Sequence, residues 1–320
     1  MASPLEQWSL DDLLDRYDEL DLSAGDDQDA DDARAAEVDR IAAELLRREP
    51  EDRGLWYDRG LLAKWRRDWP AAREFNARAL ELTPEDERTE RPSAWNLAVA
   101  ATALRDWGTA RRAWAAYGLP VDPEGDEPID GDFGPAVVRL NPPVRYIGQR
   151  DLEIDGRAGD SEVVWGRRLD PARIRITSVP LPESGHRYGD VVLHDGAPEG
   201  TRVVDGDEYP VFEEIELWER SSTPTLSVQV KGSDEDVTEL RHALDLAGLP
   251  HEDWTTEVGT VCRACSDGVL DTHDHRPDVP TDGGRRLGIA GDGDEALRVV
   301  LAWLDRAPGR ESEDVVLLLE

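Results

Sequence analysis

An internal duplication constrains the fold of this chain more than any other feature of its sequence. The tripeptide Arg67-Asp68-Trp69 occurs again 38 residues later, at Arg105-Asp106-Trp107. Small and apolar residues recur at matching places around both copies, and a weaker copy precedes them, with a helix expected over 35–48. A repeat of this length is typical of helical hairpins that stack to bury their apolar faces. The sequence therefore predicts helical repeats over 33–117.

The better copy, residues 55–86, resembles a tetratricopeptide repeat (TPR). Five residues match the family pattern: Trp56, Gly60, Ala72, Ala79 and Pro84. Three positions depart from it: Arg59, Ala63 and Asn76. The small Gly60 and Ala72 allow two helices to approach closely, and Pro84 ends the second helix. About two and a half repeats are near the minimum for a stable stack, so we expect the array to lean on a neighbouring domain.

The resemblance also implies a binding surface. TPR proteins line their concave face mainly with the first helix of each hairpin, and a protein or peptide partner binds there. Carried over residue by residue, the predicted partner-binding residues are Tyr57, Leu61, Lys64, Trp65, Trp95, Val99 and Thr102. The alternative is that Trp65 and Trp95 pack on neighbouring helices or on the following domain.

The net charge of the chain argues against some classes of binding partner. The net charge of −34 argues against nucleic acid and against anionic membranes. Residues 1–32 hold 12 acids and one base, whereas 33–117 hold 15 acids and 16 bases. We therefore expect an acidic N-terminal arm over 1–32. Its densest run, 26–32, is either a solvated loop or a segment lying on the Arg-rich helices.

The chain shows no sign of membrane insertion or secretion. No apolar stretch approaches the ~20 residues of a spanning helix, and the first residues lack a signal pattern. Two cysteines exclude a disulfide framework. These features favour a cytoplasmic protein that does not bind membranes.

After residue 117 the chain consists of a linker followed by two regions with different patterns of apolar residues. Residues 118–135 are rich in Pro, Gly and acid, which predicts a linker. From 136 to 220 apolar residues alternate, which predicts an antiparallel β unit, in part a closed barrel, with strands over 137–140, 162–168, 173–179, 190–194 and 213–219. Residues 224–320 show the order β-α-β twice, which fits a ferredoxin-like sandwich with a strand over 254–261. The predicted fold class is multidomain, α followed by α+β.

The loop 262–284 holds both cysteines of the chain. Cys262 and Cys265 form a C-x2-C pair, followed by His273 and His275. Two thiolates and two imidazoles are the ligand set of a closed tetrahedral Zn²⁺ site, which would be structural. The alternatives are free thiols in a polar loop and a redox C-x2-C pair, which is disfavoured because no helix follows.

These features favour an adaptor or scaffold that binds a protein or peptide, with a zinc-stapled C-terminal module. The alternative is an enzyme or small-ligand sensor with a site between the β unit and the ferredoxin-like unit, where His186, Arg187 and Tyr188 are the candidates. Ser184, His186 and Asp190 do not make a triad, because triad residues come from separate elements. The glycine-rich stretch 282–293 lacks the Lys-Ser/Thr end of a phosphate loop.

Overall fold

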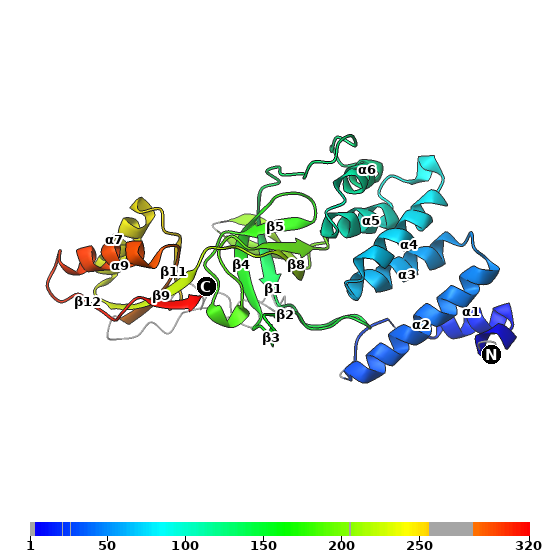
Figure 1. The fold of residues 1–320 in the computed structure, drawn as a ribbon, viewed down its shortest axis with the longest axis horizontal. Coiled ribbons are helices and arrows are strands. Elements are labelled where there is room, and N and C mark those ends of the chain that lie inside the picture. The colour runs from blue at the N-terminus through cyan, green and yellow to red at the C-terminus, as the bar shows by residue number, and fades with distance from the viewer. Residues whose placement is uncertain (1–3, 21, 26, 205, 256–283) are drawn as a thin grey trace. The chain divides into compact units, whose positions relative to one another are not determined.

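The computed structural model describes residues 4–20, 22–25, 27–204, 206–255 and 284–320. The chain divides into two compact units. The helical unit consists of Met1–Asp130 and Pro143–Asp151, and the strand unit of Gly131–Pro142 and Leu152–Glu320. The predicted order, helices first and strand-rich structure after, is confirmed (Figure 1). Among the described residues, no helix combines the length and the apolarity needed to cross a bilayer.

The helical unit is built from antiparallel helices that follow one another closely in sequence. Most begin at an Asp or Ser whose side chain accepts a hydrogen bond from the first turn, a strong helix-start signal. Its elements are η1 (Pro4–Gln7), α1 (Leu10–Asp18), α2 (Gln28–Arg48), α3 (Arg53–Trp65), α4 (Trp69–Glu81), η2 (Glu85–Glu87), α5 (Pro92–Ala103) and α6 (Trp107–Tyr117).

The two Arg-Asp-Trp turns have the same geometry. Arg67 and Arg105 lie in the left-handed region, with φ of 59° and 58°. The following Asp68 or Asp106 caps the next helix by accepting a hydrogen bond from the backbone N–H three residues on. The duplication in the sequence is therefore also a duplication of backbone structure.

Gly60 allows α3 and α4 to approach closely, as its small size predicts. A Cβ at this position would lie 2.4 Å from Nδ2 of Asn76 on α4. Asn76 departs from the TPR pattern, and the structure shows what it does instead. Its buried Nδ2 donates to the carbonyl oxygen of Ala72 at 2.8 Å.

The acidic N-terminal segment is more ordered than an arm or loop. The loop interpretation of the run up to residue 32 is wrong from Gln28 onward, where α2 begins. The side chain of Asp27 caps this helix, and acidic residues in its first turn favour it electrostatically. Upstream, α1 buries Leu13 completely against Ile41 and Leu45 of α2. Hydrophobic contacts, rather than charge alone, therefore hold this segment on the helices.

Residues Pro143–Asp151, here called the strap, lie within the sequence range expected for the β unit but pack on the helical unit. Ile147 is buried with Ala35, Val38 and Leu62. The backbone also pairs with the segment between α1 and α2, where Ile147 N–H donates to the oxygen of Leu22 at 3.1 Å. The strap is thus a segment without helix or strand that docks on helices, with a turn at 146–149, where Gln149 N–H donates to the oxygen of Tyr146 at 3.0 Å. The linker predicted before it has no helix or strand from residue 118 to 134.

The first part of the strand unit is a barrel-like sheet closed by five of its described strands. These are β1 (Pro135–Leu140), β4 (Glu162–Arg168), β5 (Arg173–Ile176), β6 (Val191–His194) and β8 (Asp207–Glu219). Neighbours are antiparallel except β1 and β8, whose parallel pairing closes the ring. Val138, Ile174 and Val192 lie at the centre of its apolar core.

Two hairpins and one short helix accompany the barrel: β2 (Glu153–Ile154) with β3 (Arg157–Ala158), β7 (Gly200–Val204) with the start of β8, and η3 (Pro182–Ser184). The predicted strands are present, but β8 begins at Asp207 rather than 213, and β7 is not predicted. Pro210 makes this stretch look unlike a strand. It is accommodated here because β7 and β8 form the hairpin at the sheet margin.

In the last part of the strand unit, the described residues form a sheet covered on one face by the helices α7 and α9. Its elements are β9 (Thr225–Lys231), α7 (Asp234–Leu246), β10 (His251–Asp253), β11 (Gly284–Ala290), α9 (Gly293–Leu304), β12 (Glu311–Ser312) and β13 (Val316–Leu319). All pairings are antiparallel, in the order β10-β11-β9, with β12 and β13 both on the far edge of β9. Of the strand predicted over 254–261, only Trp254 and Thr255 are described, and β10 ends before them.

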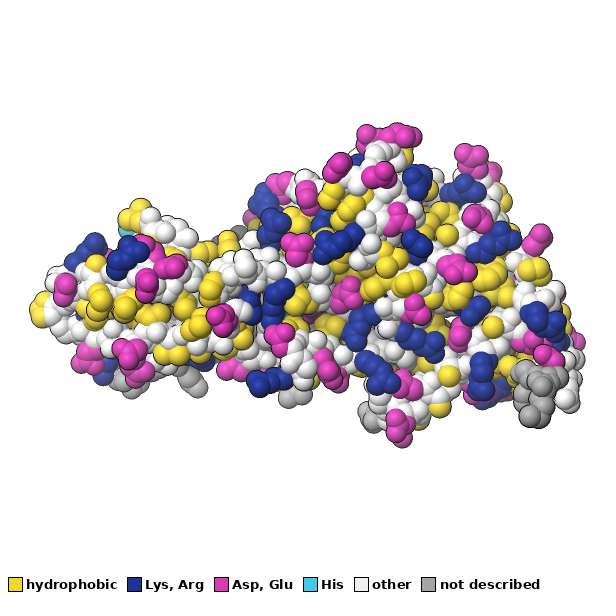
Figure 2. All heavy atoms as spheres, viewed as in Figure 1, with side chains coloured by type: hydrophobic (Ala, Val, Ile, Leu, Met, Phe, Trp, Pro, Cys, Tyr) yellow, Lys and Arg dark blue, Asp and Glu magenta, His cyan; other side chains and the backbone are white. Residues whose placement is uncertain are grey.

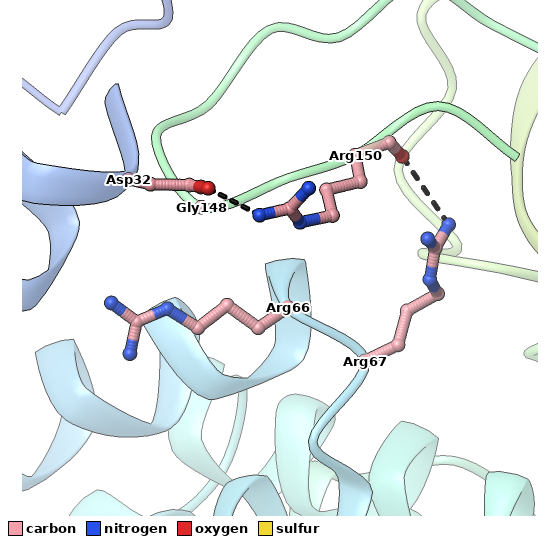
Figure 3. A pocket seen from close by; sticks show the side chains of 5 residues that line it. All are labelled: Asp32, Arg66, Arg67, Gly148 and Arg150. Atoms are coloured by element: carbon pink, nitrogen blue, oxygen red, sulfur yellow. Dashed lines mark hydrogen bonds and ion pairs between the residues drawn. The ribbon is translucent and has the colours of Figure 1, made fainter. Parts of the chain in front are cut away.

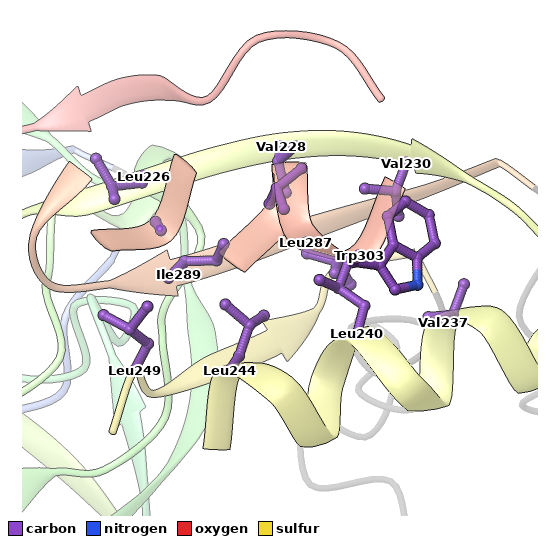
Figure 4. Packing of buried hydrophobic residues seen from close by; sticks show 12 residues of the cluster. Leu226, Val228, Val230, Val237, Leu240, Leu244, Leu249, Leu287, Ile289 and Trp303 are labelled. Atoms are coloured by element: carbon purple, nitrogen blue, oxygen red, sulfur yellow. The ribbon is translucent and has the colours of Figure 1, made fainter. Parts of the chain in front are cut away.

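The core of this sheet follows the predicted alternation. Leu226, Val228 and Val230 of β9 face α7 and α9, and Trp303 of α9 completes the cluster (Figure 4). The indole Nε1 of Trp303 donates to the carbonyl oxygen of Asp236 at 2.8 Å, so its polar atom is satisfied inside the core.

Candidate functional site

The predicted partner-binding residues lie on two helices but differ in accessibility. Tyr57, Leu61 and Trp65 form a half-buried stripe at every fourth residue of α3. On α5, Val99 and Thr102 are fully buried and Trp95 is half-buried. α5 is apolar on nearly all its faces, and such a helix is buried in a folded protein. The α3 stripe is therefore the more accessible part of the predicted surface.

Lys64 and Trp95 act as packing residues in the helical unit. The Nζ atom of Lys64 donates to Oδ1 of Asn96 at 3.0 Å, which links α3 to α5. Only 2% of Lys64 is exposed, so Lys64 does not offer its positive charge to a partner, as the sequence suggests it would. The Trp95 ring packs edge-on against Trp114 and Tyr117, with centroids 4.7 and 4.8 Å away.

The strap covers one end of the α3 stripe. The ring of Tyr146 stacks on Trp65, with centroids 4.3 Å apart and planes 14° from parallel. Tyr146 also forms an antiparallel bridge with Ser23, so backbone pairing and ring stacking act together. The chain itself therefore supplies an aromatic side chain, from a non-helical segment, to a tryptophan that the TPR resemblance assigns to partner binding.

A cationic pocket lies where the strap passes the end of α3. It is about 330 Å³ in volume and is lined by Asp32, Arg66, Arg67, Gly148 and Arg150 (Figure 3). Arg150 forms an ion pair with Asp32. Arg67 donates from Nη1 to the carbonyl oxygen of Arg150 at 3.4 Å. On the face of the molecule that Figure 2 shows, side chains of both signs of charge are interspersed.

Sequence reasoning misses this pocket. Arg150 lies more than 80 residues from Arg67, and nothing in the repeat pattern links them. One signal was present in the sequence. The two turns read Arg66-Arg67-Asp68-Trp69 and Leu104-Arg105-Asp106-Trp107, so a second arginine replaces an apolar residue in one copy only.

The strand unit buries a histidine among carboxylates. Nε2 of His186 lies 3.0 Å from Oε2 of Glu214, and Nδ1 lies 3.5 Å from Oδ2 of Asp190, with all three side chains inaccessible. Burial opposes the charged imidazolium, but Glu214 and Asp190 outweigh it and raise the pKa of His186 to about 9. The cluster is therefore an internal ion pair of the barrel.

Neighbouring groups of this cluster argue against nucleophilic chemistry. The Oγ of Ser184 donates to the carbonyl oxygen of Leu181 at 2.8 Å, not to the imidazole. Burial raises the pKa of Glu162 to about 8. Arg220 neutralises Asp190 from a second side, with Nη1 at 3.2 Å from Oδ2. The geometry agrees with the expectation that Ser184, His186 and Asp190 form no triad.

A second pocket lies within the strand unit, next to α7 and β10. It is about 560 Å³ in volume, and its lining is polar: Thr177, Tyr188, Thr238, Arg241, His242, Asp245, Pro250 and His251. Of the three residues proposed for a small-ligand site, Tyr188 lines it, whereas His186 faces the buried carboxylates and Arg187 donates to the oxygen of Ser221.

The predicted zinc ligands Cys262, Cys265, His273 and His275 lie outside the described residues. Within the part of the chain that the structure describes, no three His, Cys, Asp or Glu side chains are grouped to hold a metal ion. The zinc prediction therefore still depends on the sequence pattern alone.

No protein-family profile, curated protein or solved structure matches this chain. Function is therefore inferred from the chemistry of the α3 stripe, the strap and the two pockets.

Proposed function

We propose that this protein is an adaptor that binds a non-helical segment of a partner protein along α3. The observation that carries the proposal is the docking of the strap, a non-helical segment of the same chain, on Trp65 and Leu62. A surface that holds one such segment by stacking and apolar contact offers the same chemistry to another. Tyr57 and Leu61 continue the stripe beyond the strap, and tyrosine is among the residues that contribute most to binding energy.

The folds predicted for the helical repeats and for the C-terminal module fit this role. The duplicated turns and the close approach of α3 and α4 at Gly60 support TPR-like hairpins. The strand order β10-β11-β9-β13, with α7 and α9 on one face, supports a ferredoxin-like module. In this proposal the helical unit captures the partner, and the C-terminal module provides a second docking or regulatory surface.

The test begins with a selection of peptides from a random displayed library on the full chain. Binding of the selected peptides is then measured by fluorescence polarisation. We expect Tyr57→Ala and Leu61→Ala each to weaken binding by about tenfold or more, the size of an interface anchor. Tyr209→Ala, the same substitution at a half-buried tyrosine of the barrel, is the matched control and leaves binding unchanged. Selected peptides that bind Tyr57→Ala and Leu61→Ala as tightly as wild type would contradict the proposal.

We propose further that loop 262–284 binds one structural Zn²⁺ through Cys262, Cys265, His273 and His275. The support is the C-x2-C pair with two nearby imidazoles. Metal analysis of the purified protein should give about one zinc per chain. Cys262→Ser with Cys265→Ser should remove the metal and lower the melting temperature together. Protein purified without metal supplementation or chelator that contains no zinc would contradict it.

The polar pocket beside Tyr188 favours a second candidate function, the sensing of a small ligand. Two histidines, an arginine and hydroxyl groups around about 560 Å³ are suited to a polar, hydrogen-bonding molecule. A metabolite that raises the melting temperature of wild type but not of His242→Ala or Tyr188→Phe would favour it over the adaptor.

A further inference from the structure

The cationic pocket has more positive charge than its surroundings neutralise. Three guanidinium groups line it with one carboxylate, that of Asp32, which pairs with Arg150. Arg67 donates only to the carbonyl oxygens of Arg150 and Asp151, at 3.4 and 3.3 Å. Among the described residues, no Asp or Glu forms an ion pair with Arg66 or Arg67. The pocket therefore carries a net charge of about +2, from three arginines and one aspartate, in a chain whose net charge is −34.

The backbone of the strap is shaped around Arg66. Gly148 has φ of +77°, in the left-handed region, and a Cβ there would lie 2.9 Å from Nε of Arg66 and 3.3 Å from the Cβ of Ala35. Glycine adopts this conformation readily, and its lack of a Cβ leaves room for the side chain of Arg66. The stem of Arg66 thus lies close to Gly148, whereas its exposed guanidinium points away from those of Arg67 and Arg150 (Figure 3).

The twin turn shows that the repeat does not need this arginine. Leu104 occupies the place of Arg66 before Arg105, and the backbone of the turn is the same. Helix termination and capping therefore explain neither Arg66 nor its position beside Arg150. The clustering of like charges costs free energy in the folded state, and binding of an anion would remove that cost.

We propose that Arg66, Arg67 and Arg150 form a binding site for a phosphate monoester. Guanidinium groups donate in a planar fork that matches phosphate oxygens, and a phosphate offers three oxygens to several forks at once. Its charge of about −2 at neutral pH matches the charge of the pocket, whereas a carboxylate supplies −1 and two oxygens. The site goes beyond the adaptor function and does not depend on it.

Occupancy of the site has a structural consequence. Arg66 and Arg67 directly follow α3, whereas Arg150 belongs to the strap, so one phosphate toward which these flexible side chains turn would bridge both elements. The bound anion holds the strap against Trp65. The phosphate comes either from a small phosphorylated metabolite or from a phosphorylated side chain of a partner protein, and both present the same group.

The experiment measures binding to the full chain by isothermal titration with N-acetyl-phosphoserine and with a phosphoserine peptide of otherwise Gly, Ala and Ser residues. N-acetyl-serine and acetate are the probes without phosphate. Hydrogen exchange of the strap amides is followed in parallel. We expect phosphate-dependent binding and slower exchange of the strap. Arg66→Gln should weaken binding by about tenfold or more, which is the loss of one charge-assisted contact.

Arg105→Gln is the matched control, because it removes the same charge at the twin turn, which does not line the pocket. It should leave binding within about twofold. Tighter binding of the peptide than of N-acetyl-phosphoserine would identify a phosphorylated protein as the source, and equal binding a small phosphorylated molecule. Equal losses in Arg66→Gln and Arg105→Gln would show general charge attraction and overturn the site. Binding of acetate as tight as that of the phosphoserine probe would also overturn it, as would no binding at all.

Discussion

The helical unit and the barrel contain the same kinds of charged residue but use them differently. In the helical unit, pairs such as Arg73 with Asp106 and Arg53 with Glu87 join partly exposed side chains at 3.0 Å. In the barrel, the side chains of Arg173 with Asp170 and His186 with Glu214 are almost completely inaccessible. Exposed pairs contribute about 0–1 kcal/mol, whereas loss of one partner of a buried pair leaves an uncompensated charge.

The comparison shows that burial, not the number of ion pairs, decides where charge matters in this chain. The helical unit is held mainly by apolar clusters such as Leu13 with Ile41 and Leu45, and its surface pairs adjust the stability by small amounts. The barrel depends on a few charges that must all be satisfied. Substitutions of similar chemistry should therefore have different consequences in the two units.

The largest loss of folding stability is expected for His186→Asn in the barrel. The substitution leaves Glu214 and Asp190 buried with less positive charge, which typically costs about 3–5 kcal/mol. The matched change in the helical unit is Arg73→Gln, which removes an exposed partner of Asp106 and should cost less than about 1 kcal/mol. Hydrogen exchange of amides in β6 and β8, against those in α4 and α6, reports each unit separately. Equal costs in the two units would refute the comparison.

The second largest difference between the two units is expected in how their stability depends on pH. The pKa of His186 is raised from 6.5 to about 9, so its contribution is fully present below pH 6.5 and is lost as the pH rises through 9. The pKa of Glu162 is raised from 4.5 to about 8 by burial, so the folded state also loses stability as the pH rises from 4.5 to 8, where the unfolded carboxyl is ionised and the folded one is not. The barrel should lose on the order of 3 kcal/mol between pH 6.5 and 9 through His186 alone.

Urea unfolding at pH 6.5, 8 and 9, followed by the NMR cross-peaks of barrel amides such as Val192, checks this expectation. In His186→Asn the loss over the same range should shrink to the part due to Glu162. A barrel whose urea midpoint rises with pH in the wild type would show that the imidazolium is not the stabilising form.

Helices, strands and turns could be predicted from this sequence where a pattern within one short segment determines them. The strand predicted over 162–168 is β4, and the duplicated Arg-Asp-Trp tripeptide predicts the same turn at Arg67–Trp69 and at Arg105–Trp107. The predictions missed contacts between residues far apart in the chain. No period in the sequence indicates that β1 and β8 pair in parallel and close the barrel.

The candidate site shows the same limit. The TPR resemblance implies Tyr57, Leu61 and Trp65 as partner-binding residues, and the structure places all three on one helix. That Tyr146 stacks on Trp65 could not be predicted, because the strap is separated from α3 by more than 70 residues and looks like part of the β unit. The resemblance also implies Lys64 as a partner-binding residue, but the structure buries it, although lysine is usually exposed. Asn96 provides the buried acceptor that makes the exception possible.

The smallest expected change in stability concerns the two Arg-Asp-Trp turns. Both turns lie in the helical unit, so they can be compared with each other directly. Arg67 and Arg105 both adopt a positive φ, which costs an L-residue about 1 kcal/mol and glycine almost nothing. Glycine also gains entropy when unfolded, so Arg105→Gly should raise stability by only about 0.5 kcal/mol. Arg67→Gly has the same backbone gain but loses the hydrogen bonds to the carbonyl oxygens of Arg150 and Asp151, so its net gain should be smaller or absent. Chemical denaturation of the two variants side by side measures the difference. If the two changes were equal, the arginine would contribute nothing to holding the strap, and stacking of Tyr146 on Trp65 with burial of Ile147 would have to do so alone.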